Sequence, residues 1–176
     1  MKLGKIIRRF LVPSPIITIY YFLKYGAKIS PKAEVELSDL LKIGKNTEVG
    51  SFAKIKASDG TLNIGKNVVI ATGCFIVSHE KGLEIGDYSM VGPNTAIMAN
   101  GYRYDRLDTS IKEQGAISNK GVIIADNVWI GANCSILDGA NIGSGTIVSP
   151  NSVVSGKIPE NSIVMGNPGK VIFKRR

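Results

Sequence analysis

Residues 124–154, IADNVWIGANCSILDGANIGSGTIVSPNSVV, decide the fold, because an aliphatic residue recurs in this stretch at every sixth position. The members of this series are Ile124, Ile130, Ile136, Ile142, Val148 and Val154. A period of six matches neither the 3.6-residue repeat of an amphipathic helix nor the alternation of a half-buried strand. The stretch is therefore expected to form a repeating architecture built from short units.

The same ladder extends toward the start of the chain in groups of three aliphatic positions. Its further members are Ile43, Val49, Ile55, Ile64, Ile70, Ile76, Ile85, Val91 and Ile97, preceded by a less regular Ile29 and Val35. The step lengthens from six to nine residues in two places, where the segments DGTLN and EKGLE each add three residues. Small residues such as Cys74 and Cys134 often follow four places after an aliphatic one.

A coil with three short flat faces explains this ladder. Each group of six residues supplies one strand and one corner, and its aliphatic side chain fills the axis of the coil. Successive coils stack at the ~4.8 Å spacing of parallel strands, so that each coil buries its neighbours. The spacing predicts an all-β protein, a parallel β-helix that carries one long inserted loop.

Composition is consistent with one globular domain. The 176 residues are 44% apolar, which supports a core, and 20 glycines favour many tight turns. The formal net charge of +8 suggests an anionic partner, such as phosphates or a membrane surface, although solubility alone explains it equally well. Neither a P-loop nor an aromatic and basic nucleic-acid module is present, so we expect no nucleic-acid partner.

Cys74 and Cys134 stand in equivalent places of two coils that are separated by one more coil. Two strand spacings place them ~9–10 Å apart, which is too far for a disulfide. We therefore expect two buried, reduced thiols and a cytoplasmic location. Because the chain has one histidine, we expect no metal site.

Residues 1–28 form a basic and apolar segment that we expect to be partly helical. Its apolar run, residues 10–23, is broken by Pro13 and Pro15 and is too short to span a membrane, and no signal cleavage site follows it. Four basic residues, Lys2, Lys5, Arg8 and Arg9, precede this run. Residues 1–26 are therefore expected either to contact a membrane surface peripherally or to pack on the body of the protein.

One corner of the coil is irregular. Ser58, His79 and Asn100 occupy the same place in three successive coils and are expected to form a polar column. After Asn100 the ladder is interrupted by 21 residues, 101–121. A long loop on a regular scaffold is where function is usually carried, and His79 lies on the coil next to it.

Three further segments carry a resemblance to a known family. They are SIKEQG at residues 110–115, DNVWIGANCSILDGANIG at 126–143 and GNPGKVI at 166–172. Together with the ladder over residues 29–172, they resemble the hexapeptide-repeat acyltransferases, in the branch that acetylates sugars and small hydroxyl or amine compounds. The resemblance implies a left-handed β-helix, acetyl-CoA as co-substrate, and a homotrimer with the cofactor in a groove between coils.

In the proteins of this family, a histidine in the loop removes the proton from the acceptor, and that position is Tyr102 here. Three interpretations stay open. His79 acts as the base from the adjacent coil, which suits an imidazole with its ordinary pKa of about 6.5. Alternatively, Tyr102 or a loop carboxylate, Asp105 or Asp108, acts, although a free phenol with a pKa of about 10 is a poor base. In the third interpretation the site is degenerate.

The resemblance also implies binding residues. Thr72, Glu80, Asn100 and Asp105 are expected to bind the acceptor. The residues expected to bind the cofactor are Trp129, Gly131, Ala132, Ser149, Lys157, Asn167 and Lys170, with Lys174 as a further cation. Pro150 stands where a second amide of the family faces the cofactor and has no N–H, so Ser149 or Asn151 would replace it. Packing of the loop for Trp129, and simple solvation for the lysines, are the alternatives.

The sequence thus predicts three parts: residues 1–28, the β-helix at 29–165 with its loop at 101–121, and a C-terminal tail at 166–176. The predicted function is transfer of an acetyl group from acetyl-CoA to a hydroxyl or amine of a sugar, in the biosynthesis of a surface polysaccharide. The expected location is the cytoplasm, with peripheral contact at the inner face of the membrane. The alternative is a non-catalytic trimeric scaffold or membrane-surface binding protein.

Overall fold

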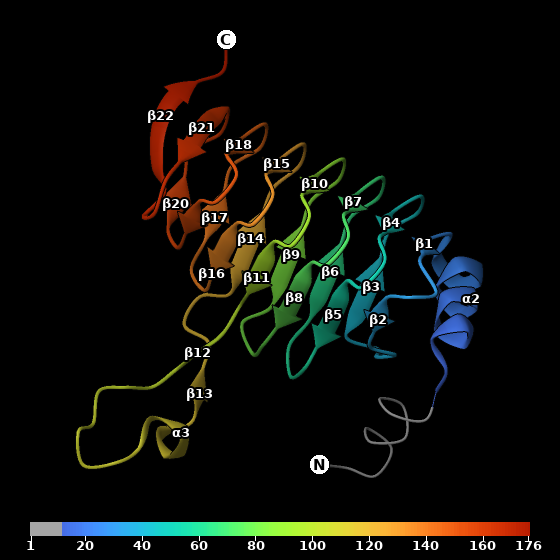
Figure 1. Ribbon diagram of the computed structural model, residues 1–176, viewed down its shortest axis with the longest axis horizontal. Helices are drawn as coiled ribbons and strands as arrows, with labels where there is room; N and C mark the ends of the chain where they lie inside the picture. Colours follow the sequence, from blue (N-terminus) through green and yellow to red (C-terminus); the bar gives the residue numbers. More distant parts are fainter. Residues whose placement is uncertain (1–11) are drawn as a thin grey trace.

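The computed structural model describes residues 12–176 and shows a stack of coils with three flat faces (Figure 1). Sheet A contains β1 (Lys28–Ile29), β4 (Glu48–Val49), β7 (Val69–Ile70), β10 (Met90–Val91), β15 (Trp129–Ile130), β18 (Ile147–Val148), β21 (Ser162–Met165) and β22 (Lys170–Lys174). Sheet B contains β2 (Glu34–Val35), β5 (Lys54–Ala57), β8 (Phe75–Ser78), β11 (Ala96–Met98), β16 (Ser135–Leu137) and β19 (Val153–Val154). Sheet C contains β3 (Leu41–Ile43), β6 (Leu62–Ile64), β9 (Leu83–Ile85), β14 (Val122–Ile124), β17 (Asn141–Ile142) and β20 (Lys157–Ile158).

The chain visits the three sheets in turn, so each coil has an A–B, a B–C and a C–A corner. Within the three sheets, strands from successive coils pair in parallel, and only β21 and β22 pair antiparallel. Partners in the register are equivalent ladder residues, for example Ile97 with Ile76 and with Ile136. This confirms the predicted parallel β-helix.

The ladder residues form the core along the axis of the stack. All fifteen positions of the ladder are buried, as are Ile29 and Val35 at its beginning. The residue before each of them points outward, which gives the strands a pattern of exposed and buried positions. A period of six therefore places at least one buried side chain on each face of each coil, and some strands bury a second, such as Leu62 beside Ile64 in β6.

Buried hydroxyl groups satisfy backbone groups at several corners. Thr95 Oγ1 donates to the carbonyl of Gly131 at 2.8 Å and accepts the N–H of Cys134 at 3.1 Å. Thr47 and Ser89 make the same pair of bonds at their own corners. Small residues are required there because the next coil lies only one strand spacing away.

The two cysteines are buried and free, as expected. Thr95 lies between them, since its carbonyl accepts the N–H of Phe75 and its hydroxyl accepts that of Cys134. Burial raises the pKa of both thiols, so neither is a ready thiolate nucleophile.

Both ends of the stack are covered. Helix α2 (Ser14–Tyr25) covers the first coil with Ile17 and Tyr21, and the hydroxyl of Tyr21 donates to the carbonyl of Glu36 at 2.8 Å (Figure 1). At the other end, the predicted tail contains β22, which folds back on β21. The division at residues 28 and 165 stays a prediction, and Lys2, Lys5, Arg8 and Arg9 lie outside the described residues. Within residues 12–176, no helix is long and apolar enough to cross a membrane.

Neighbouring residues of β14 test whether the axis supplies the stability. Ile124 is buried and Ile123 is 43% exposed. We expect Ile124→Ala to lower the free energy of unfolding by about 2–5 kcal/mol, because it opens a cavity in the axis. Ile123→Ala, the matched control, is expected to cost less than about 1 kcal/mol. Denaturant unfolding measures both, and equal losses would contradict an axial core.

Candidate active site

Residues 101–121, called the arm below, leave the stack at a B–C corner. Its stem is a two-stranded antiparallel ribbon of β12 (Gly101–Tyr102) and β13 (Ala116–Ile117), and its outer part carries α3 (Ile111–Gln114) (Figure 1). Ser110 caps this short helix, because its hydroxyl donates to the carboxylate of Glu113 at 2.7 Å and accepts the N–H of the same residue at 3.4 Å. The insertion therefore lies where the ladder predicts it.

Asp138, on the next coil, holds the returning end of the arm. Its carboxylate accepts the backbone N–H groups of Asn119 at 2.6 Å, Lys120 at 3.2 Å and Gly121 at 2.7 Å. Sequence reasoning missed this residue. Its only signal is the acidic residue in the irregular hexad ILDGAN, which nothing in the sequence links to a segment 17–19 residues earlier.

His79 lies at the base of the arm, in the turn between β8 and β9. The register of Val77 with Met98, continued by two residues, places Asn100 beside His79. The register of Gly101 with Ile117 in the stem, continued by one residue, places Ser118 opposite Asn100. The predicted column thus borders both strands of the stem.

Two polar atoms at this corner are buried without a partner. Among the side chains of residues 12–176, only His79 Nδ1 and Ser118 Oγ are buried nitrogen or oxygen atoms that make no hydrogen bond. Buried polar groups are nearly always paired, so each such atom calls for an explanation. This corner therefore holds one nitrogen and one hydroxyl that are buried without the partner that burial calls for.

The other candidate bases lie on the arm itself. Tyr102 is 54% exposed on the stem, and Asp105 is exposed. Asp108 is bound by the guanidinium of Arg106 at 3.1 and 2.9 Å and by the hydroxyl of Thr109 at 3.0 Å. These bonds, Arg106 first and Thr109 second, lower the pKa of Asp108 and make it a weaker base than an ordinary carboxylate.

Three of the seven predicted cofactor residues, Gly131, Ala132 and Ser149, lie at the A–B corner. Gly131 lies against the next coil, because a Cβ there would meet Pro150 N at 2.6 Å. The backbone N–H of Ser149 already donates to the carbonyl of Val164 at 2.8 Å, so only its hydroxyl could replace the amide missing at Pro150. Ala132, between Gly131 and Asn133, is partly exposed at the same corner.

The remaining predicted binding residues are more scattered. Trp129 is 47% exposed on the outer face of sheet A, between Met90 and Ile147. Lys157 is on sheet C, whereas Asn167 lies in the turn before β22, which begins with Lys170. A groove of about 600 Å³ lies elsewhere, between α2 and sheet A.

In one chain, the predicted residues thus form two groups rather than one site. His79, Glu80, Asn100 and the arm lie at the B–C corner. Ala132 and its neighbours lie at the A–B corner, at the other end of the strands of sheet B. The two corners are at most ~20 Å apart along β16, because six residues of extended chain join Ala132 to Asp138 at the B–C corner. Thr72, expected with the acceptor residues, is also at the A–B corner, where its hydroxyl donates to the carbonyl of Ser51 at 2.6 Å.

The contribution of Asp138 can be measured directly. We expect Asp138→Ala to lower the free energy of unfolding by about 1–3 kcal/mol, because three N–H groups lose one acceptor. Hydrogen exchange at residues 119–121 should become faster. The control is Glu84→Ala, which removes an exposed carboxylate from β9 and should change stability by less than about 0.5 kcal/mol. Unchanged exchange at 119–121 in the Asp138 variant would show that the arm is held by other contacts.

Comparisons with known proteins agree with this architecture. Residues 121–156 match the family described as bacterial transferase hexapeptide (six repeats). Over 168 residues, the chain is 33% identical to the probable acetyltransferase Rv3034c of Mycobacterium tuberculosis, a match that covers 96% of this chain and 55% of that protein. It is also 33% identical, over 73% of this chain and 58% of that protein, to the putative lipopolysaccharide biosynthesis O-acetyl transferase WbbJ of Escherichia coli. The chain thus spans little more than half the length of these relatives.

Solved structures show the same fold at lower identity. A mutant of the N-acyltransferase AntD of Bacillus cereus, in complex with dTDP and coenzyme A, superimposes with a TM-score of 0.76 at 23% identity, covering 90% of this chain and 88% of that one. PerB of Caulobacter crescentus, in complex with CoA and GDP-perosamine, gives a TM-score of 0.64 at 22% identity over 84% and 57% of the two chains. With its ladder, its three parallel sheets and these relatives, the chain is a left-handed parallel β-helix and belongs to the bacterial hexapeptide-repeat transferase family.

Proposed function

We propose that the protein transfers an acetyl group from acetyl-CoA to a hydroxyl or amine of a sugar, in the biosynthesis of a surface polysaccharide. The observation that carries the proposal is an arm that leaves a hexapeptide-repeat stack beside its only histidine, in a chain whose named relatives are acetyltransferases. A relative from Lactococcus lactis is named galactoside O-acetyltransferase, and WbbJ is named for lipopolysaccharide biosynthesis. These names support a sugar as the acceptor class.

In the proposed reaction, an oxygen or nitrogen of the acceptor attacks the carbonyl carbon of the thioester. A base takes the proton of the attacking group, and the negative charge develops on the carbonyl oxygen. Collapse of this intermediate expels the thiolate of CoA, which leaves as the thiol after it receives a proton. The steps need one general base and at least one N–H donor directed at the oxyanion.

We assign the base to His79. The imidazole lies at the foot of the arm beside Asn100, which is opposite Ser118, and two buried polar atoms at this corner have no partner. Tyr102 offers an exposed phenol, and Asp108 is already bound by Arg106. Glu80, Asn100 and Asp105 complete the proposed acceptor side.

The proposed cofactor site uses the other group of residues. The pantetheine part of the cofactor would run along the A–B corner, past Gly131, Ala132 and Ser149. Trp129, on sheet A, would form a wall of this site. Lysines near the C-terminal end would face the phosphates: Lys157, Lys170 and Lys174. The backbone N–H of Ala132 is the proposed donor to the oxyanion.

A homotrimer is part of this proposal. The two groups of residues lie at different corners of one chain, and in a trimer a second copy would bring an acceptor corner to a cofactor corner. A cytoplasmic location, with peripheral contact at the inner face of the membrane, is also proposed, and it suits acetyl-CoA and two buried reduced thiols.

Acetyl transfer can be tested by mixing the protein, acetyl-CoA and a panel of sugars, and measuring the thiol released. We expect thiol release to depend on at least one acceptor, and CoA to bind in calorimetry. Trp129→Ala should weaken CoA binding about tenfold, since it removes a large apolar wall. The absence of both turnover and CoA binding would favour the alternative, a non-catalytic trimeric scaffold. Tyr102 at the family's histidine position and Pro150 support that alternative.

The assignment of the base rests on a comparison of two variants. We expect His79→Ala to lower kcat/KM by about 10²–10⁴, because proton transfer in the transition state is lost. Tyr102→Phe, which removes only the hydroxyl, should change kcat/KM by less than about tenfold. Both variants should bind CoA as the wild type does. An unchanged kcat/KM for His79→Ala removes His79 from the chemistry.

A further inference from the structure

Helix α2 is apolar on two opposite faces, and the stack covers only one of them. Ile17 and Tyr21 pack on the first coil and are 8% and 0% exposed. On the outer face lie four apolar side chains, Ile16, Ile19, Phe22 and Leu23, which are 56%, 57%, 56% and 78% exposed. An apolar face of this kind on a helix at the end of a molecule marks a surface for a partner.

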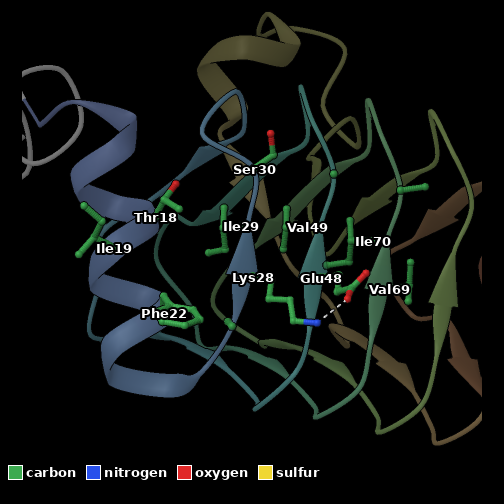
Figure 2. A pocket seen from close by; sticks show the side chains of 13 residues that line it. Thr18, Ile19, Phe22, Lys28, Ile29, Ser30, Glu48, Val49, Val69 and Ile70 are labelled. Atoms are coloured by element: carbon green, nitrogen blue, oxygen red, sulfur yellow. Dashed lines mark hydrogen bonds and ion pairs between the residues drawn. The ribbon is translucent and has the colours of Figure 1, made fainter.

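The outer face lies partly over the groove between α2 and sheet A and is more than half exposed at all four residues. Ile19 and Phe22 both line the groove that separates α2 from β1, β4 and β7 (Figure 2). At one side of this groove, Lys28 and Glu48 form an ion pair at 2.9 Å (Figure 2). The outer face is thus accessible as a continuous strip, with Tyr20 and Tyr25 partly exposed beside it.

Charge identifies the partner. Residues 1–33 contain no Asp or Glu. Their basic residues are Lys2, Lys5, Arg8, Arg9, Lys24, Lys28 and Lys32. These seven charges are nearly the whole formal net charge of +8, so the other residues are close to neutral. Lys24 lies in the last turn of α2, with its ammonium 2.7 Å from the hydroxyl of Tyr20.

We propose that α2 binds the surface of a membrane that contains anionic lipid, with Ile16, Ile19, Phe22 and Leu23 among the lipid headgroups. An apolar helix face with Lys and Tyr beside it, in a segment rich in basic residues, is the pattern of a helix that lies in a membrane interface. The basic residues of this end attract anionic headgroups, except for Lys28, whose charge is paired with Glu48. A second copy fits this face less well, because two such ends would bring two sets of basic residues together.

Docking of this kind also orients the enzyme. Helix α2 crosses the end of the stack, so the coils extend away from the surface to which α2 binds (Figure 1). In this orientation the arm and the A–B corner do not contact the membrane. The inference concerns location and does not rest on acetyl transfer; it specifies the residues and the lipid class for the proposed peripheral contact.

Co-sedimentation with vesicles tests the inference on the full chain. We expect binding to vesicles of phosphatidylcholine with phosphatidylglycerol to be at least about tenfold tighter than to phosphatidylcholine alone, and to weaken as salt rises. Leu23→Glu should reduce binding to the anionic vesicles by about tenfold or more, because it places a charge on the apolar face. The matched control is Tyr88→Glu, which adds the same charge at a 58% exposed residue on a C–A corner and should bind nearly as the wild type does.

Two further measurements separate the alternatives. Leu23→Glu should keep the oligomeric state in light scattering and the rate of acetyl transfer to a soluble acceptor. A change of oligomeric state without vesicle binding would show that the outer face binds another copy and would overturn the proposal. The proposal also fails if wild type and Leu23→Glu bind equally, if neutral and anionic vesicles bind equally, or if nothing sediments. Loss of vesicle binding with retained turnover leaves the proposed enzyme intact.

Discussion

Each inner coil of this protein buries its aliphatic side chains against the coils above and below it. The parallel register pairs each ladder residue with its equivalent in the next coil, one strand spacing away. Local stacking of this kind replaces a common centre, and stability is expected to spread along the whole length. The two ends would expose the axis, and α2 and the β21–β22 hairpin cover them.

The same constraint decides where polar chemistry can occur. Between coils there is room for hydroxyls and small side chains, and Thr95 and its equivalents bond there to backbone groups of the next coil. Larger polar side chains must stand at corners or on an insertion. The arm and His79 satisfy this rule, and Asp138 shows how a corner carboxylate can hold an insertion without disturbing the axis.

Much of the fold could be predicted because the ladder is a local property of the sequence. The period of six predicts the register of the strands, the stacking of Ser58, His79 and Asn100, and the free buried cysteines. Which of the predicted site residues lie at the same corner was harder to predict. Thr72 and His79 both lie near ladder positions. The sequence pattern does not show that Thr72, at the A–B corner, and His79, at the B–C corner, are at opposite ends of strand β8.

The sequence by itself determined the parallel β-helix, the place of the insertion and the identity of its neighbours, because each follows from residues at a fixed spacing. Only the tertiary structure decided that Asp138 holds Asn119, Lys120 and Gly121. It also decided that His79 and Ser118 keep buried polar atoms without partners, and that one face of α2 stays uncovered. These features depend on where an irregular segment returns to the stack or ends, and such segments have no period from which their contacts can be read.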